Sequence, residues 1–421
     1  MRIGLFSNTY WPFTGGVPVA VDTMAEQLMA KGHKVSIITS TNAGEMKDPP
    51  YVHRINYLSL PGIPESRLKI SNRNQWIWNL FWAIDTPLGG RIALSARDQI
   101  RHIVEDEAID IIHVNQPFGL GLQALLVAKE KGIPCIYTFH TQYEHYLKGI
   151  LVENPLISHI VSHYSYKFAN SCDYVIAPSE TIKTLLLKHH VRVPIKVIPT
   201  GVGNAFAYRG NRAFIRRKYN ISKNTKVFIT VSRLSSAKNV GAIIRAFSLI
   251  HGKEPDTHLL IVGDGREKAA LEREAEKLGI TDAVSFTGDI PRKNLPHYYA
   301  GADIFLFASR YESQGIVLIE AMATGLPIIS FDIPAAREAL KGSGASLVNN
   351  AEEMALKAVC LLKDKSLRRE ISICSREKSL LFDPSRLADE TLKLYTYLIT
   401  ADNKRVSSIA QDLIIGNAGV S

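Results

Sequence analysis

Two carboxylates eight positions apart are the clearest chemical feature of this 421-residue sequence. Glu312 stands in a polar turn after a run typical of a buried strand, and Glu320 lies in the helical pattern that follows Gly315. The first backbone N–H groups of such a helix are unpaired and carry partial positive charge, which suits a phosphate. Two carboxylates beside a phosphate cradle suit a ligand with both hydroxyls and phosphates, such as a sugar nucleotide.

A second strand-to-helix turn carries two positive charges. Arg233 and Lys238 lie five positions apart, between a strand pattern at 227–231 and a helical pattern at 240–250. Either cation alone would usually be an ordinary surface residue. Two cations beside the start of one helix can neutralise a diphosphate, so the pair indicates a phosphate-binding turn in the second half of the chain.

The first half of the chain offers a glycine turn and a histidine. Gly15 and Gly16 precede the helical pattern at 17–31, where a glycine backbone can approach a phosphate or sugar closely. The spacing is not G-x-G-x-x-G, so it does not indicate a dinucleotide. His140 follows the buried strand pattern at 133–139, and ligands of doubly wound folds bind at such strand ends. On its own, a histidine such as His140 is more often a polar side chain with a structural partner than a catalytic residue.

Taken together, these motifs resemble those of retaining GT-B glycosyltransferases of family 4. The resemblance covers roughly residues 1–400, and its spacing, glycine and flanking residues agree. Asn8 departs from the pattern, because many relatives carry Asp there. The matching motifs are E-x7-E (Glu312 and Glu320), R-x4-K (Arg233 and Lys238), T-F-H-T (138–141), G-G-V before the first helix, and the interdomain crossing V-I-P-T-G-V (197–202).

The resemblance implies a role for each of these residues toward a nucleoside diphosphate sugar. His140 and Glu312 are the expected catalytic residues: His140 approaches the donor sugar and the acceptor, and Glu312 holds the sugar hydroxyls. Glu320 is expected to hold the ribose. The other implied donor contacts are Gly15, Gly16, Arg233, Lys238, Gly263, Gly288, Ser313, Gln314 and Gly315.

The order of elements predicts the fold class. Both halves alternate strand and helix patterns, which predicts an α/β protein with parallel sheets covered on both faces. With the resemblance, we expect GT-B architecture: two Rossmann-like, doubly wound domains that face each other across a cleft. The expected parts are an N-terminal acceptor-side domain (1–200), a C-terminal nucleotide-sugar-binding domain (201–384), a helix crossing back to the first domain (385–400) and a loose tail (401–421).

Composition narrows the setting. The chain has 46% hydrophobic and 21% charged residues, an ordinary globular balance, and we expect neither a signal peptide nor a membrane span. Its four cysteines lack C-x-x-C spacing and are typical of buried thiols in a reducing compartment. The net charge of +10 favours nucleic acid, anionic membrane or phosphorylated ligands as partners. Zinc-finger spacing and RNP-like motifs are absent from the sequence, so we expect no nucleic-acid partner.

A tryptophan-rich segment at 66–84 suggests a membrane contact. Trp76, Trp78 and Trp82 lie there behind three basic residues, a composition that suits an anionic membrane interface. A core or acceptor-cleft helix is the alternative. We therefore expect peripheral attachment to the inner face of the cytoplasmic membrane, and an acceptor site that includes Glu144, His145, Trp78 and Trp82.

The expected reaction is transfer of a hexose from a nucleotide sugar to a membrane lipid with retention of configuration. The resemblance points to UDP-glucose as donor and diacylglycerol as acceptor, by front-face displacement without a covalent nucleophile. No D-x-D motif occurs, so we expect neither a metal nor a cofactor. The alternatives are a phosphatidylinositol or polysaccharide acceptor, a sugar-nucleotide epimerase, and a non-enzymatic basic adaptor or nucleic-acid binder that retains the fold.

Overall fold

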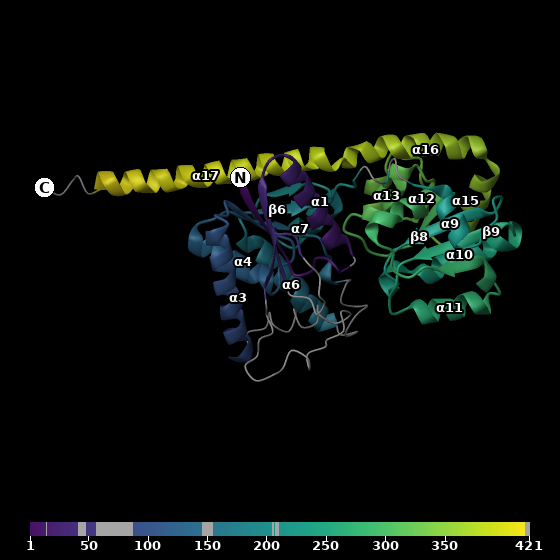
Figure 1. The fold of residues 1–421 in the computed structure, drawn as a ribbon, viewed down its shortest axis with the longest axis horizontal. Helices are drawn as coiled ribbons and strands as arrows, with labels where there is room; N and C mark the ends of the chain where they lie inside the picture. The colour runs from purple at the N-terminus through teal and green to yellow at the C-terminus, as the bar shows by residue number, and fades with distance from the viewer. Residues whose placement is uncertain are drawn as a thin grey trace.

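The computed structural model of the chain describes residues 1–13, 15–40, 48–55, 87–144, 155–203, 206 and 210–416. Within these ranges the chain forms two α/β bodies, joined by the segment after the first sheet and by the last helix, which runs back over the first body (Figure 1). Each body contains one parallel sheet. The prediction of two Rossmann-like domains is confirmed.

The first sheet has the strand order β3-β2-β1-β4-β5-β6-β7, and every neighbouring pair is parallel. This order reverses direction between β1 and β4, where ligands of doubly wound folds bind. The strands are β1 (Arg2–Ser7), β2 (Lys34–Ser40), β3 (Val52–Ile55), β4 (Ile111–Val114), β5 (Cys135–Thr138), β6 (Tyr174–Ala177) and β7 (Ile195–Val197). The helices are α1 (Gly16–Ala30), α3 (Pro87–Asp106), α4 (Leu120–Lys131), α6 (Pro155–Ser171) and α7 (Glu180–Lys188).

The second sheet repeats the arrangement with the order β10-β9-β8-β11-β12-β13, again parallel throughout. Its strands are β8 (Lys226–Val231), β9 (Thr257–Val262), β10 (Val284–Phe286), β11 (Ile304–Phe307), β12 (Ile328–Phe331) and β13 (Ser346–Val348). Its α-helices are α9 (Arg212–Lys218), α10 (Val240–Lys253), α11 (Lys268–Lys277), α12 (Leu295–Gly301), α13 (Ile316–Thr324), α14 (Pro334–Leu340), α15 (Ala351–Lys363) and α16 (Lys365–Ser379). Short 3₁₀ turns are η2 (Ser236–Lys238), η3 (Thr281–Ala283), η4 (Arg292–Asn294) and η5 (Leu380–Phe382).

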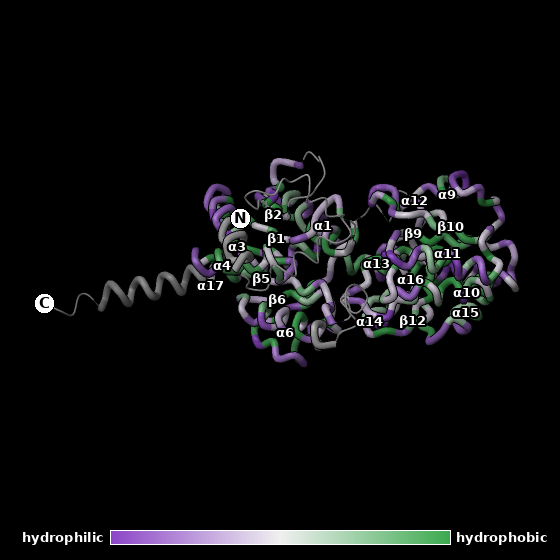
Figure 2. The backbone as a smooth tube through the Cα atoms, turned by 90° about the horizontal axis from the view of Figure 1, so that it is seen from below, coloured by the Kyte–Doolittle hydropathy of each residue, from purple (hydrophilic) through white to green (hydrophobic). Residues whose placement is uncertain are grey.

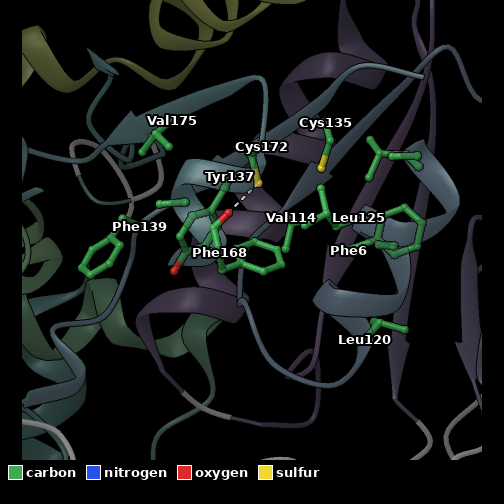
Figure 3. Close-up of a cluster of buried hydrophobic side chains, with 14 of the residues drawn as sticks. Phe6, Val114, Leu120, Leu125, Cys135, Tyr137, Phe139, Phe168, Cys172 and Val175 are labelled. Atoms are coloured by element: carbon green, nitrogen blue, oxygen red, sulfur yellow. Dashed lines mark hydrogen bonds between the residues drawn. The ribbon is translucent and has the colours of Figure 1, made fainter. Parts of the chain in front are cut away.

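Burial on both faces explains why most strand positions are apolar. In the first sheet, Phe6 and Ile38 face the core shared with α3, α4, α6 and α7, whereas Leu5 and Ile37 face the opposite core. Figure 3 shows the first of these cores, where Tyr137 and Cys172 pack among aromatic and aliphatic side chains. Hydrophobic segments concentrate in the strands and hydrophilic ones in outer helices and turns (Figure 2).

The last helix, α17 (Pro384–Gly416), completes the other core of the first domain. Leu387, Leu394 and Tyr395 are buried there against α1 and the sheet, and Lys31 pairs with Asp389 at 2.7 Å. The helix continues to residue 416, whereas the sequence predicts a helix ending at 400 and a loose tail after it. The physical reason is that no glycine or proline interrupts 385–415, so nothing in the local sequence ends the helix earlier.

The chain passes between the domains twice, near Gly201 and again near Pro384, and these two crossings lie side by side. A Cβ on Gly201 would lie 2.5 Å from the Cα of Pro384, so a glycine is needed for this close approach. Val202 N–H donates to the carbonyl of Phe382 at 3.1 Å.

In the part of the chain that the structure describes, no helix combines the length and apolar character needed to cross a membrane.

Candidate active site

The carboxyl ends of the two sheets meet at a polar site. Gln142 follows β5 of the first domain, and its Nε2 donates to the backbone carbonyl of Glu312, which follows β11 of the second domain, at 2.7 Å. Residues 170 positions apart are therefore direct neighbours. Parallel sheets bind ligands at this edge, so each domain presents its ligand-binding edge to the other.

Two helix N-termini converge at this junction. A Cβ on Gly16, the first residue of α1, would lie 3.7 Å from Cδ1 of Ile316, the first residue of α13. Among the described residues, no side chain caps either helix start. Gly315 adopts φ +81° at the start of α13, a conformation that favours glycine. Uncapped helix starts from both domains provide N–H groups for an anion.

Lys238 of the R-x4-K motif and Glu312 of the E-x7-E motif form an ion pair. Lys238 Nζ lies 2.5 Å from Glu312 Oε1, and both side chains are largely buried. The two turns that carry them are joined by the backbone, because Arg310 N–H donates to the carbonyl of Ala237 at 2.8 Å. Arg233 is exposed at the beginning of the same turn as Lys238. The structure thus brings the E-x7-E and R-x4-K motifs together.

Glu320 is almost completely buried, with 2% of its surface exposed, and both of its oxygens have partners. Arg292 Nη1 lies 2.8 Å from Oε1, and the hydroxyl of Tyr299 donates to Oε2 at 2.7 Å. Burial, followed by the negative charge of Glu320, raises the pKa of Tyr299 well above its usual value, so Tyr299 is a neutral donor. Sequence reasoning missed both partners of Glu320.

His140 lies at the end of β5 as predicted and is electrically neutral. Its Nε2 lies 2.9 Å from Oδ1 of Asn115, which follows β4. Burial lowers the pKa of His140 to about 4. On β4, His113 is bonded on both ring nitrogens, to Thr138 Oγ1 and to the hydroxyl of Tyr395, each at 2.6 Å. Burial lowers its pKa to about 3. The last helix thereby supports the strand ends that carry Asn115 and His140.

The first domain and the crossing hold the loop before α13 in place. Ser179 Oγ donates to the carbonyl of Ser313 at 2.6 Å. The amide of Gln314 forms two bonds with the backbone of Thr200, accepting from its N–H at 2.8 Å and donating to its carbonyl at 2.9 Å. Both ends of this side-chain amide therefore engage the crossing. The expected contact of Gln314 with the nucleotide-sugar donor stays a prediction.

Gly263 and Gly288, two of the glycines predicted to contact the nucleotide-sugar donor, differ in what surrounds them. Gly263 has φ +124°, and a Cβ there would lie 2.0 Å from the carbonyl oxygen of Ser232, so the absent side chain lets two turns pack closely. Gly288 has φ +69°, and none of the described atoms lies within 4 Å of its Cβ position. The two turns are linked by Gly263 N–H donating to Gly288 O at 3.0 Å.

Comparison with known sequences identifies the family. Residues 14–206 match the profile "Glycosyltransferase Family 4", and residues 211–378 match "Glycosyl transferases group 1". The alpha-monoglucosyldiacylglycerol synthase of Streptococcus pneumoniae is 31% identical, over 99% of this chain and 87% of its own. The chain belongs to the family 4 glycosyltransferases. The alpha-monoglucosyldiacylglycerol synthase of Acholeplasma laidlawii is 27% identical to this glycosyltransferase, over 97% of this chain and all of its own.

Solved structures agree on the fold of the glycosyltransferase. HepE of Anabaena, in complex with UDP and glucose, aligns with a TM-score of 0.73 at 18% identity, over 94% of this chain and 100% of its own. The sucrose-phosphate synthase of Thermosynechococcus elongatus aligns with a TM-score of 0.74 at 20% identity, over 95% and 99% of the two chains. The predicted GT-B architecture is confirmed.

The predicted acceptor residues are only partly described. Glu144 of the glycosyltransferase is half-buried, 3.8 Å from Nε2 of His189, the residue that follows α7. His145, Trp78 and Trp82 lie outside the described residues, as does the whole segment 66–84. Across the ranges that the structure describes, no three His, Cys, Asp or Glu side chains gather as metal ligands.

Several residues of the site had weak signals or none in the sequence. Arg292 could have been found from its place four positions after Gly288, which the resemblance implies as a contact with the nucleotide-sugar donor. Asn115 could have been found as the polar residue after a buried strand. Gln142 and Ser179 have no comparable signal, because their role is a contact with the other domain.

Proposed function

We propose that this glycosyltransferase moves a hexose, namely glucose, from UDP-glucose to a membrane lipid such as diacylglycerol, with retention of configuration. The observation that carries the proposal is the Lys238–Glu312 pair beside the two uncapped helix starts where the domains meet. Such a site suits a ligand that has a diphosphate next to sugar hydroxyls. The names of the two alpha-monoglucosyldiacylglycerol synthases support the choice of sugar and acceptor.

The second domain is proposed to stabilise the leaving group. Cleavage of the bond between the anomeric carbon and the diphosphate leaves negative charge on the departing oxygen, and fixed charges aimed at it lower the barrier. Arg233, Lys238 and the N–H groups at the start of α13 supply positive charge without a metal. Glu312 then accepts hydrogen bonds from the sugar hydroxyls and Glu320 from the ribose. The carboxylates are thus not the acid/base pair of a glycoside hydrolase.

The first domain is proposed to present the acceptor. The acceptor hydroxyl oxygen forms the new bond to the anomeric carbon on the face that the diphosphate leaves, and its proton passes to the departing phosphate oxygen. His140 is neutral near pH 7, so its ring can hydrogen-bond the donor sugar or the acceptor without adding charge. This route needs no covalent nucleophile.

The membrane location is proposed from charge and composition. The chain carries a net charge of +10, and basic residues precede the tryptophans of segment 66–84. Both features favour peripheral binding to an anionic leaflet, here the inner face of the cytoplasmic membrane. Sedimentation with vesicles tests this: replacing Trp78 and Trp82 with Ser should release the protein from anionic vesicles, and equal binding of the unaltered protein to neutral vesicles would contradict it.

The decisive experiment is incubation with labelled nucleotide sugars and total membrane lipids, followed by lipid extraction. We expect label from UDP-glucose in a glycolipid with an α-linked hexose. Label in phosphatidylinositol or in a polysaccharide would identify that molecule, and not diacylglycerol, as the acceptor. Conversion of the free donor without transfer would indicate an epimerase. Salt-dependent DNA binding without donor binding would indicate an adaptor and contradict the proposal.

A further inference from the structure

Arg292 connects three parts of the molecule at the base of the site. Its guanidinium contacts Oε1 of Glu320 at 2.8 Å and lies 5.1 Å from the ring centre of Phe206, which follows the crossing. The same ring packs edge-on against Tyr299, with the ring centres 5.7 Å apart. Phe206 and Tyr299 are both buried, so the two partners of Glu320 share one buried aromatic support.

This arrangement fixes the orientation of the Glu320 carboxylate. A buried carboxylate must be paired, and each of its oxygens accepts about two hydrogen bonds. Arg292 uses one acceptor position on Oε1, and Tyr299 uses one on Oε2. Because one partner holds each oxygen, the carboxylate plane is set and one acceptor position remains on each side. Two neighbouring hydroxyls can fill those two positions together.

We propose that Arg292 and Tyr299 are positioning residues that aim Glu320 at the 2′- and 3′-hydroxyls of the donor ribose, and so make the enzyme select ribonucleotides over 2′-deoxyribonucleotides. This inference rests on the proposed donor role of Glu320. Arg292 neutralises the buried charge, and Tyr299 sets its rotation. Neither residue needs to touch the sugar being transferred.

The places of Arg292 and Tyr299 in the fold support their proposed role in positioning Glu320. Arg292 opens η4, directly after the turn that contains Gly288, and Tyr299 lies on α12, which packs beside α13 (Figure 1). Arg292 is also close enough to Glu26 on α1 to lower the pKa of that carboxyl, against the larger raising effect of burial. The residue that aims Glu320 thus also faces the first domain.

The test compares binding of UDP and 2′-deoxy-UDP by titration calorimetry. We expect the unaltered protein to prefer UDP by about 10- to 100-fold, because 2′-deoxy-UDP lacks one charge-assisted hydrogen bond. In Arg292→Gln the preference should fall to about threefold or less, since Glu320 loses its cation. In Tyr299→Phe, which keeps the ring, we expect an intermediate preference. The melting temperature of each variant is recorded in parallel.

The controls separate a positioning role from a merely structural one. Arg245→Gln removes an exposed arginine that pairs with Glu274 at 2.5 Å, and should leave the preference unchanged. A structural role would lower the melting temperature of the site variants while keeping their preference for UDP, and that result would overturn the inference. If Arg292→Gln fails to fold, Tyr299→Phe and Arg292→Lys carry the test.

The outcome also distinguishes this inference from the proposed function. If the unaltered protein transfers hexose from UDP-glucose but binds UDP and 2′-deoxy-UDP equally, the inference fails and the function stands. If the preference behaves as expected but no nucleotide sugar supports transfer to lipid, the proposed reaction fails and the ribose contact stands.

Discussion

The two sides of the site hold their polar groups in different ways. In the second domain, ion pairs hold the charged residues: Lys238 pairs with Glu312, and Arg292 pairs with Glu320. In the first domain, His140 meets the neutral amide of Asn115, and its pKa is lowered so that the ring stays uncharged. The first domain adds backbone N–H groups at Gly16 and no ion pair to this part of the described site.

This difference is consistent with the proposed roles of the two domains, donor binding in the second and acceptor binding in the first. Diphosphates and sugar hydroxyls are recognised by fixed charges and charge-assisted hydrogen bonds, which the second domain provides. A neutral hydroxyl acceptor is better met by a neutral surface, because a charged group there would need costly desolvation. Variants that change one side only should therefore affect leaving-group chemistry and acceptor chemistry separately.

The largest effect is expected on the charged side. Lys238→Ala should lower kcat by about 10²- to 10³-fold, because one fixed charge beside the leaving group is lost. Arg233→Ala should slow transfer in the same way. Steady-state kinetics at saturating donor measure the effect, with Arg245→Gln as the matched control. Loss of all activity in EDTA, restored by magnesium or manganese, would show instead that a metal neutralises the diphosphate.

Glu312→Gln should have the next largest effect. The amide keeps the shape but removes a charge-assisted bond worth about 1.5–3 kcal/mol, so transfer should fall about 10- to 150-fold. Melting temperatures should show that the variant is folded. Glu274→Gln, in an exposed pair on the same domain, is the control. A folded Glu312→Gln variant with unchanged turnover would exclude the assigned role.

A smaller effect is expected from the contact that joins the two sides. Gln142→Ala removes one neutral hydrogen bond to the backbone of Glu312, worth about 0.5–1.5 kcal/mol, so kcat should fall about 2- to 10-fold. Asn170→Ala is the control, because Asn170 bonds the backbone of His190 within the first domain. Equal transfer rates for Gln142→Ala and Asn170→Ala would mean that the hydrogen bond between Gln142 and Glu312 does not contribute to catalysis.

The smallest effect on rate is expected from pH on the neutral side. Because the pKa of His140 is lowered to about 4, the transfer rate should show no histidine inflection near pH 6.5. A pH–rate profile between about pH 5 and 8 checks this, and an inflection near pH 6.5 that vanishes in His140→Gln would contradict it.

The free energy of unfolding should also depend on pH through His140. Between about pH 6.5 and pH 4 the unfolded chain binds a proton on His140 that the folded chain does not. The free energy of unfolding should therefore fall as the pH drops through that window, and His113, whose pKa is lowered to about 3, continues the fall below it. Urea unfolding at several pH values measures the slope, which His140→Gln should reduce and a substitution of exposed His102 should not. An unchanged slope in His140→Gln would assign the dependence to other groups.

Local signals in the sequence were enough to place most of the site. Apolar runs between polar turns predicted both sheets, because a strand buried on two faces is mostly apolar and carries a polar side chain only where that side chain finds a partner. Glycine spacing and charge predicted the turns that hold Glu312, Arg233 and Lys238, and the helix that carries Glu320. Each of these signals lies within a few residues of the feature that it predicts.

Only the tertiary structure decided how these parts act on one another. The partners of Glu320 lie 21 and 28 positions away, and Gln142 reaches Glu312 across 170 positions. The side-chain amide of Gln314 is bonded to the crossing at Thr200, 114 positions away. Nothing local determines such pairs, because they depend on which strand ends meet once the domains pack. The sequence by itself determined the chemical groups at the site, and tertiary packing determined which of them are paired, buried or neutral.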